Sequence, residues 1–161
     1  MKNTVLLLIL LCSISIASAQ TEISDLGVKG GLNFTFFNVS EANFGENSET
    51  ATGYYGGLYL NIDFGENLHL QPEILYIGLN DFRFINAPIY INYKASKTLD
   101  ILVGPSMNYF FDFFNNKFKV RADLSLSYNI TNHINTHAKY TIGFDEITPN
   151  GLFLGVGYRF L

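Results

Sequence analysis

The sequence predicts an all-β fold, an eight-stranded antiparallel up-and-down transmembrane β-barrel. Apolar and polar residues alternate with a period of two from residue 28 to residue 160, which is typical of strands with two different faces. Several alternating segments are about 10 to 13 residues long, enough for a tilted strand to cross a bilayer. Turn-forming residues such as asparagine and glycine separate these segments.

The composition agrees with one membrane-embedded β domain. Only 15% of the 161 residues are charged, whereas 16% are aromatic. The mean hydropathy of +0.16 is high for a water-soluble protein and low for a helical membrane protein. A barrel gives such an average because apolar and polar faces cancel. The net charge of -4 argues against a nucleic-acid partner, which would require a basic patch.

Residues 1–19 have the features of a cleaved signal peptide. Lys2 supplies the positive start, a short apolar run follows, and the Ala-Ser-Ala sequence ending at Ala19 is a signal-peptidase site. The mature chain is therefore expected to begin at Gln20. Residues 20–161 are expected to form a single outer-membrane β-barrel domain.

Cys12 is the only cysteine of the chain. It suggests a lipoprotein as an alternative, but Leu11 stands where lipoprotein signals have a small residue. The cysteine is expected to leave with the signal peptide, so the mature chain would have no disulfide. After residue 20 no apolar run has the length of a transmembrane helix, and a membrane crossing would therefore require closed strands.

The first four strands are expected at residues 28–37, 57–64, 68–76 and 85–94. Val28 and Leu32 lie on one face of the first strand. Lys29 and Asn33 lie on the other. The next three strands follow the same rule with more irregularity.

The last four strands are expected at residues 99–109, 117–128, 133–144 and 152–160. The second of these is the clearest, because Leu124 and Leu126 alternate with Arg121, Asp123 and Ser125. The final two strands continue the pattern to the end of the chain.

The connections alternate roughly between short and longer ones. Short turns are expected at residues 65–67, 95–97 and 129–132. The other connections are expected at residues 38–51, 80–81, 115–116 and 145–151, the first of them a long polar loop. Short turns face the periplasm in outer-membrane barrels, and an even number of strands returns both termini to that side.

Aromatic residues gather at the strand ends: Phe36, Tyr93, Tyr109, Phe111, Phe118, Tyr128, Phe144, Tyr158 and Phe160. This placement predicts a girdle at the two membrane interfaces. The alternative explanation is ordinary β-propensity, because Phe and Tyr favour strands in any sheet.

The apolar face is expected to point outward to lipid and the polar face into the lumen. The predicted lumen charge network consists of Lys29, Asp63, Glu73, Lys94, Asp100, Asp112, Lys119, Arg121, Asp123, Lys139 and Arg159. Buried charges persist only when they are paired, and the hairpin geometry brings opposite charges together. The alternative is an ordinary solvated face, as in a soluble lipocalin-like carrier whose apolar side chains line a cavity.

Hairpin geometry predicts four groups of partners in this network. Lys94 is expected level with Asp100. Asp123 is expected opposite residues 137–139. Lys29 is expected near Asp63 and Arg159, and Asp112 near Lys117 and Lys119.

Four segments resemble the PorT-like outer-membrane β-barrel family: GVKGGLN at 27–33, GGLY at 56–59, LQPEILY at 70–76 and LGVGYRF at 154–160. The resemblance covers essentially the whole mature chain and implies a barrel like the small OmpX and OmpA barrels. It also implies that Tyr158 and Phe160 form the signal read by the barrel-assembly machinery. One departure is Leu161, because such barrels commonly end on the aromatic residue itself. The name-giving member is linked to protein secretion, so an accessory role in secretion is one possible task.

The histidines do not predict a catalytic or metal site. His133 and His137 share a face, but four residues along a strand separate them by about 13 Å, too far to bind one zinc ion. His69 and His133 lie near short turns. No enzyme activity, cofactor or metal is therefore expected.

The sequence thus predicts an integral outer-membrane protein that stabilises the envelope or presents loops to a partner. The expected partners are outer-membrane lipid and lipopolysaccharide, the barrel-assembly machinery and a protein at the surface loops, with no nucleic acid. The longer connections carry the acidic residues Glu41, Glu46, Glu49, Asp81, Asp112, Asp145 and Glu146. Eight strands leave an interior just wide enough for side chains, which disfavours a general porin.

Overall fold

Eight strands form one closed sheet in the computed structural model, which describes residues 23–41, 45–63, 65–80, 82–111, 117–144 and 150–160. The expected signal peptide and the Ala19–Gln20 cleavage site lie outside the described residues. The strands are β1 (Ile23–Glu41), β2 (Gly45–Asp63), β3 (Leu68–Leu79), β4 (Phe82–Lys94), β5 (Leu99–Phe110), β6 (Phe118–Asn129), β7 (Ile134–Gly143) and β8 (Asn150–Arg159).

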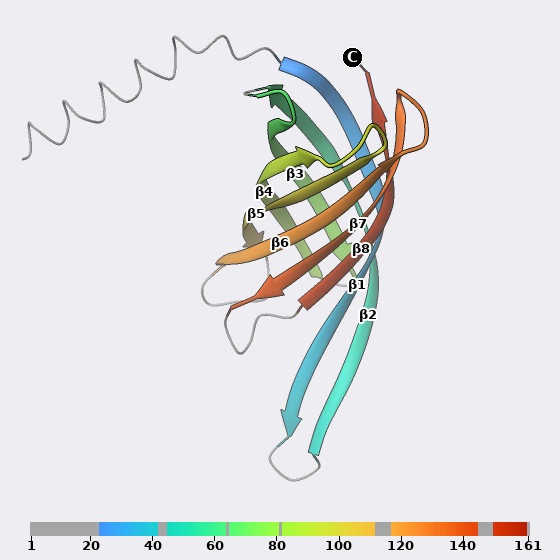
Figure 1. Ribbon diagram of the computed structural model, residues 1–161. Coiled ribbons are helices and arrows are strands. Elements are labelled where there is room, and N and C mark those ends of the chain that lie inside the picture. Colours follow the sequence, from blue (N-terminus) through green and yellow to red (C-terminus); the bar gives the residue numbers. More distant parts are fainter. Residues whose placement is uncertain are drawn as a thin grey trace, which may run out of the picture.

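Each strand pairs antiparallel with the next, and β1 pairs with β8 to close the barrel (Figure 1). The predicted fold class, an eight-stranded antiparallel up-and-down barrel, is therefore confirmed. All eight predicted strands are present, with ends within a few residues of the expected ones except in the first hairpin. Within the described ranges there is no helix long and apolar enough to cross a membrane.

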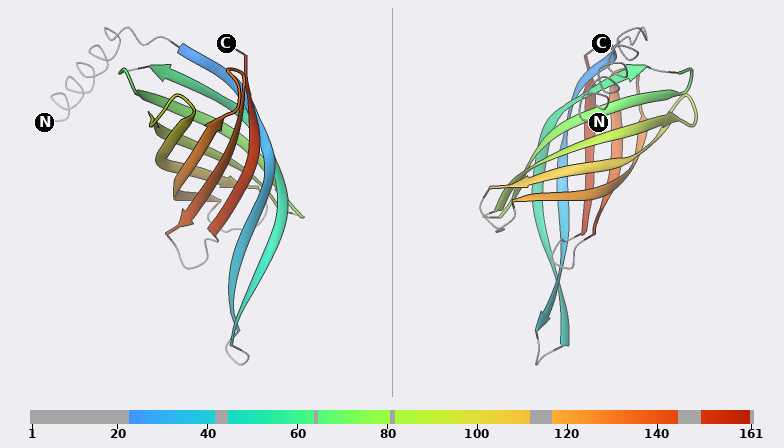
Figure 2. Two further views of the ribbon diagram at one scale, coloured as in Figure 1. Left: turned by 45° about the vertical axis from the view of Figure 1, so that its right-hand side comes forward. Right: turned by 90° about the vertical axis from the view of Figure 1, so that its left-hand side faces the viewer.

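The barrel has two unlike ends (Figures 1 and 2). The start of β1, the end of β8 and the β2–β3, β4–β5 and β6–β7 connections lie at one end, which we call the turn end. The strands β1, β3, β5 and β7 finish at the opposite end, which we call the loop end. The β3–β4 connection there is tight, and Asn80 adopts a left-handed φ of 52°, a conformation that asparagine tolerates well.

The first hairpin differs from the prediction. The segment 38–51 was expected to be a loop, but β1 continues to Glu41 and β2 begins at Gly45. Their pairing runs to Glu41↔Gly45, whereas pairing of β1 with β8 ends at Phe36. The two strands thus project beyond the barrel as a ribbon (Figure 2). The prediction was wrong because a ribbon outside the barrel has no lipid-facing side, so its polar sequence lacks the period-two signal.

Glycines allow the strands to approach closely on the inner side of the wall. A Cβ atom added at Gly31 would lie 2.1 Å from the backbone oxygen of Leu154, and one added at Gly155 would lie 2.3 Å from that of Gly30. Any larger side chain at these two positions would collide with the neighbouring strand. Such glycines are typical of the sharp bends by which a small sheet closes.

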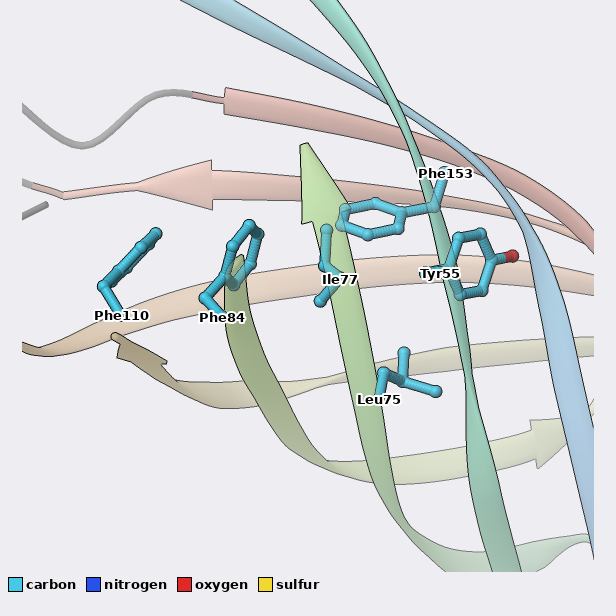
Figure 3. Close-up of a cluster of buried hydrophobic side chains, with 6 residues drawn as sticks. All are labelled: Tyr55, Leu75, Ile77, Phe84, Phe110 and Phe153. Carbon is cyan, nitrogen blue, oxygen red and sulfur yellow. The ribbon is translucent and has the colours of Figure 1, made fainter. Parts of the chain in front are cut away.

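An apolar cluster lies inside the barrel (Figure 3). Its members come from five different strands and meet across the lumen: Tyr55, Leu75, Ile77, Phe84, Phe110 and Phe153. The rings of Phe84 and Phe110 stack at 4.7 Å, and Tyr55 meets Phe153 edge to face at 5.3 Å. The interior is therefore partly a conventional core, whereas a purely polar lumen was expected.

Candidate functional site

The outer surface of the barrel is a continuous apolar belt, which we call the outer belt. On β6, Leu124 and Leu126 are about half exposed, whereas Arg121 on the same strand is only 3% exposed. The same division holds around the wall. Outward apolar side chains include Leu32, Leu58, Ile74, Ile89, Ile91, Val103, Val120, Ile142, Leu154 and Val156. The expected assignment of faces is confirmed, and this arrangement does not favour a lipocalin-like carrier, whose apolar side chains would line the inside.

Aromatic side chains edge the outer belt at both ends of the barrel. Tyr109 contacts Phe118 at the loop end with ring centroids 5.8 Å apart, and Tyr158 contacts Phe160 at the turn end at 5.6 Å. Of the nine aromatic residues expected in a girdle, seven are exposed: Tyr93, Tyr109, Phe118, Tyr128, Phe144, Tyr158 and Phe160. Two rims of this kind are typical of membrane interfaces. Phe36 and Phe111 are half-buried.

One buried ion pair joins Lys29 on β1 to Glu73 on β3. These strands are not neighbours, and the lysine reaches across β2 at Gly57, its register partner, which has no side chain to block it. Gln71 donates a hydrogen bond of 2.6 Å to the same glutamate oxygen, and Asn92 donates one of 3.0 Å to Gln71. The expected partner of Lys29 was Asp63, with Arg159 nearby on the other neighbouring strand, so the ion pair with Glu73 is a correction to the predicted pairing.

A second buried pair joins Lys139 on β7 to Asp123 on β6, with 3.6 Å between Nζ and Oδ2. Tyr90 and Ser106 donate hydrogen bonds of 3.0 and 2.8 Å to the two carboxylate oxygens of Asp123. Lys139 also donates a hydrogen bond of 2.7 Å to Asn86 across the lumen. Every oxygen and nitrogen of this pair is thus engaged, as a buried pair requires.

The turn end of the lumen holds further charged groups. Arg159 on β8 lies 3.3 Å from Asp25 on β1. Asp63 pairs with His69. Within the described residues, Asp25, Asp63 and Arg159 form no ion pair or hydrogen bond with Lys29. Lys29 lies deeper in the lumen than these three residues, and its ion pair with Glu73 on β3 holds it there.

Lys94 and Asp100 are register partners, as predicted, but no ion pair joins them in the described structure. Lys94 is half-buried at the strand end, and Asp100 instead accepts a hydrogen bond of 3.1 Å from Asn129. The short turn places these two residues level, but it does not by itself bring their charged ends together.

Lys119 and Arg121, two members of the predicted network, lie near the loop end. Lys119 is half-buried on the inner face of β6, and Asp112 lies outside the described residues. Arg121 points into the lumen against the rings of Phe110 and Phe84, at 5.3 and 5.9 Å from its guanidinium carbon.

The histidines lie apart from one another. His137 shares a hydrogen bond of 2.6 Å with the hydroxyl of Tyr55 inside the barrel. His133 lies in the exposed β6–β7 turn, where its Nδ1 is 3.2 Å from the backbone oxygen of Arg159. Within the part of the chain that the structure describes, no three His, Cys, Asp or Glu residues are grouped as a metal site would require.

Contacts between side chains of strands that do not pair cross the lumen at several levels. Sequence reasoning missed the uncharged members that cross it, above all Tyr55, Tyr90, Asn86 and Ser106. The period-two alternation of the sequence places all four side chains on the inner face, so their orientation could have been predicted. Their partners could not, because these depend on how the barrel closes.

Residues 4–160 match the model of a family described as the outer membrane protein beta-barrel domain. No curated protein matches the chain. Among solved structures, the fold is similar to a barrel from a study of de novo designed transmembrane β-barrels, with 16% identity and a TM-score of 0.59. The match covers 86% of this chain and 97% of that one.

The fold is also similar to Ail, the attachment invasion locus protein of Yersinia pestis, in a crystal structure with the heparin analogue sucrose octasulfate. The identity is 14% and the TM-score 0.55, over 84% of this chain and 98% of that one. The structure of Ail in a phospholipid bilayer nanodisc matches with 13% identity and a TM-score of 0.53, over 86% and 100% of the two chains. At these identities the likeness concerns the fold alone.

Proposed function

The chain belongs to the outer membrane protein beta-barrel domain family, and from this premise we propose a non-enzymatic integral membrane protein whose sealed barrel stabilises the outer membrane. The observation that carries the proposal is an apolar outer belt combined with a lumen that is crossed by two buried ion pairs. The belt supplies contact with acyl chains. An eight-stranded barrel is narrow, and side chains that meet across its lumen argue against passage of solutes.

Fractionation and conductance together test this proposal. The protein should pellet with outer membranes and change its gel mobility on boiling, and it should give no steady conductance in a planar bilayer. Replacing Lys29 and Glu73 together with glycine would remove one buried ion pair and serves as a positive control for a widened lumen. Recovery of the protein in the soluble periplasm would contradict membrane insertion. Steady conductance of the unmodified protein would contradict a sealed lumen.

A second candidate function is presentation of the β1–β2 ribbon to a protein partner. The observation that favours it is the pairing of β1 with β2 beyond the last pair of β1 with β8. A strand edge outside the barrel has free backbone groups that an extended segment of a partner can pair with. The acidic residues of the segment, among them Glu41 and Glu46, would favour a basic partner. They argue against a sulfated ligand of the kind seen with Ail.

A shortened variant separates the two candidates. An Asn-Gly turn in place of residues 38–48 would join the register partners Phe37 and Glu49 and leave the barrel intact. In a strain that lacks the protein, the variant should restore resistance to detergent if the barrel itself stabilises the envelope. If it inserts normally but restores nothing, the ribbon carries the function, and proximity labelling from the ribbon should then identify its partner.

Export and assembly complete the proposal. The mature protein would begin at Gln20, which mass spectrometry of the purified protein tests directly. Tyr158 and Phe160 are exposed at the turn end, where the barrel-assembly machinery would read them. Lipopolysaccharide is the proposed lipid partner at the loop end. An accessory role in secretion, suggested by the PorT-like resemblance, is tested by comparing the secreted proteins of strains with and without this chain.

A further inference from the structure

The loop end of the lumen holds a buried cation that the ion pairs described above leave unneutralised. Arg121 is 3% exposed, and within the described residues no carboxylate lies at ion-pair distance from it. The nearest acidic residue along β6 is Asp123, whose oxygens are engaged by Tyr90, Ser106 and Lys139. A buried guanidinium without a counter-charge is costly, so its retention calls for a partner.

The free donors of Arg121 form one edge of the guanidinium. In the described part of the chain, Nε and Nη2 are the two nitrogens of this group that are buried without a hydrogen-bond partner. The N–H bonds of Nε and Nη2 point in the same direction along one edge of the planar guanidinium. This edge can donate two parallel hydrogen bonds to a carboxylate or a phosphate. The rings of Phe110 and Phe84 lie beside the group and hold it in place.

The strands that follow β6 around the wall carry glycines and further unpartnered polar groups. Gly143, the register partner of Arg121 on β7, has no side chain, and the diagonal neighbour Thr141 is buried with its hydroxyl unpartnered. On β1, the Nδ2 of Asn33 is likewise buried and unpartnered. A Cβ added at Gly151 on β8 would lie 3.5 Å from that nitrogen. Unpartnered polar groups and side-chain-free positions thus alternate along β6, β7, β8 and β1.

We propose that Arg121 is the centre of an oxyanion-binding site in the loop end of the lumen. The ligand would be a small anion with a carboxylate or phosphate group, bound by two hydrogen bonds to the Nε–Nη2 edge. Lipid headgroups are excluded as the source, because the side chain lies inside the wall, whereas lipid contacts the outer belt. The site would bind its anion without conducting it, since the ion pairs towards the turn end close the lumen.

Inorganic phosphate and acetate are suitable probes, each titrated against chloride at constant ionic strength. The mature protein, refolded in neutral detergent, would be followed through its arginine Nε–H resonances by NMR. The resonance of Arg121, identified as the one missing from R121K, should shift saturably with phosphate, with acetate or with both. R121Q should bind roughly tenfold more weakly or worse, from the loss of two charge-assisted hydrogen bonds.

Arg83 provides the matched control, because it is also an arginine at the loop end but is exposed on the outer side of β4. R83Q should bind the probe as the unmodified protein does. The proposal is overturned if the Arg121 resonance does not respond to either anion, as expected if a carboxylate of the chain itself already occupies the edge. Equal losses in R121Q and R83Q would also overturn it. The resonance of the unmodified protein decides the question even if R121Q does not fold.

Discussion

Replacement of outward side chains on β6 by arginine should cost stability according to their depth in the membrane. Leu124, Leu126 and Tyr128 lie on the same face of this strand and are equally exposed, at 49%, 48% and 52%. Leu124 is near the middle of the strand and Tyr128 near its turn end. Arginine should therefore cost about 2–4 kcal/mol at Leu124, an intermediate amount at Leu126 and about 0–1 kcal/mol at Tyr128. In a water-soluble barrel all three would change stability by only about 0.5 kcal/mol.

Equilibrium unfolding in phosphatidylcholine vesicles measures these costs. The chain has no tryptophan, so the folded fraction is best followed by the mobility of unboiled samples on gels. Alanine at the same three positions is the control, since it removes the side chain without adding a charge. Equal costs for the three arginine variants, or no cost at Leu124, would refute the placement of this face in lipid.

Ser125, an inward-facing position on β6, is a poor control for the outward arginine substitutions. Parity alone places Ser125 on the polar inner face, where an added arginine should have a mild effect. However, Ser125 is buried and is the register partner of Lys139. An arginine there would add a second positive charge in a filled space, so the expectation of a mild effect is revised.

Three further outcomes are expected. Lys29→Met should cost about 3–5 kcal/mol in the same unfolding assay, because Glu73 would stay buried and unpaired; adding Glu73→Gln should recover part of the loss. Gly155→Ala should lower the yield of refolded barrel, because its Cβ would lie 2.3 Å from a backbone oxygen of β1, whereas Gly56→Ala, with 3.9 Å to the nearest atom, should fold normally. Backbone amides of residues 37–41 should exchange hydrogen faster than those of β6, and equal protection would contradict a ribbon paired on one side only.

The division into an outer apolar face and an inner polar face could be predicted from the sequence. Side chains alternate between the two faces along a strand, so the orientation of one residue fixes the orientation of all the others. Once Leu124 is placed outside, parity places Arg121 and Asp123 inside, and the structure agrees. The same parity places Leu75 and Ile77 inside, yet the lumen was expected to be polar. A closed barrel of eight strands needs a filled interior whatever the chemistry of its side chains, so bulky apolar residues also occupy it.

The partners within the lumen could not be predicted, because neighbours along a hairpin are not the residues that meet. Lys94 and Asp100 are level but do not pair, whereas Lys29 reaches Glu73 over a strand between them. The intervening strand presents Gly57 to Lys29, and any side chain at Gly57 would collide with the backbone of Ile74 on β3. Which distant side chains meet across a lumen follows from strand tilt and closure, and neither is visible in a local pattern.

Contacts across the lumen tie together strands that do not pair. Tyr55 on β2 meets His137 on β7, and Lys139 on β7 meets Asn86 on β4. To open the lumen, several such bonds must break together, and each buried group left without a partner costs about 1–3 kcal/mol. The ribbon beyond the barrel has no such ties and is paired on one side only. If the ribbon binds a partner, as the second candidate function has it, binding should therefore reshape the ribbon and leave the barrel unchanged; in that function the barrel would be a rigid mount in the membrane.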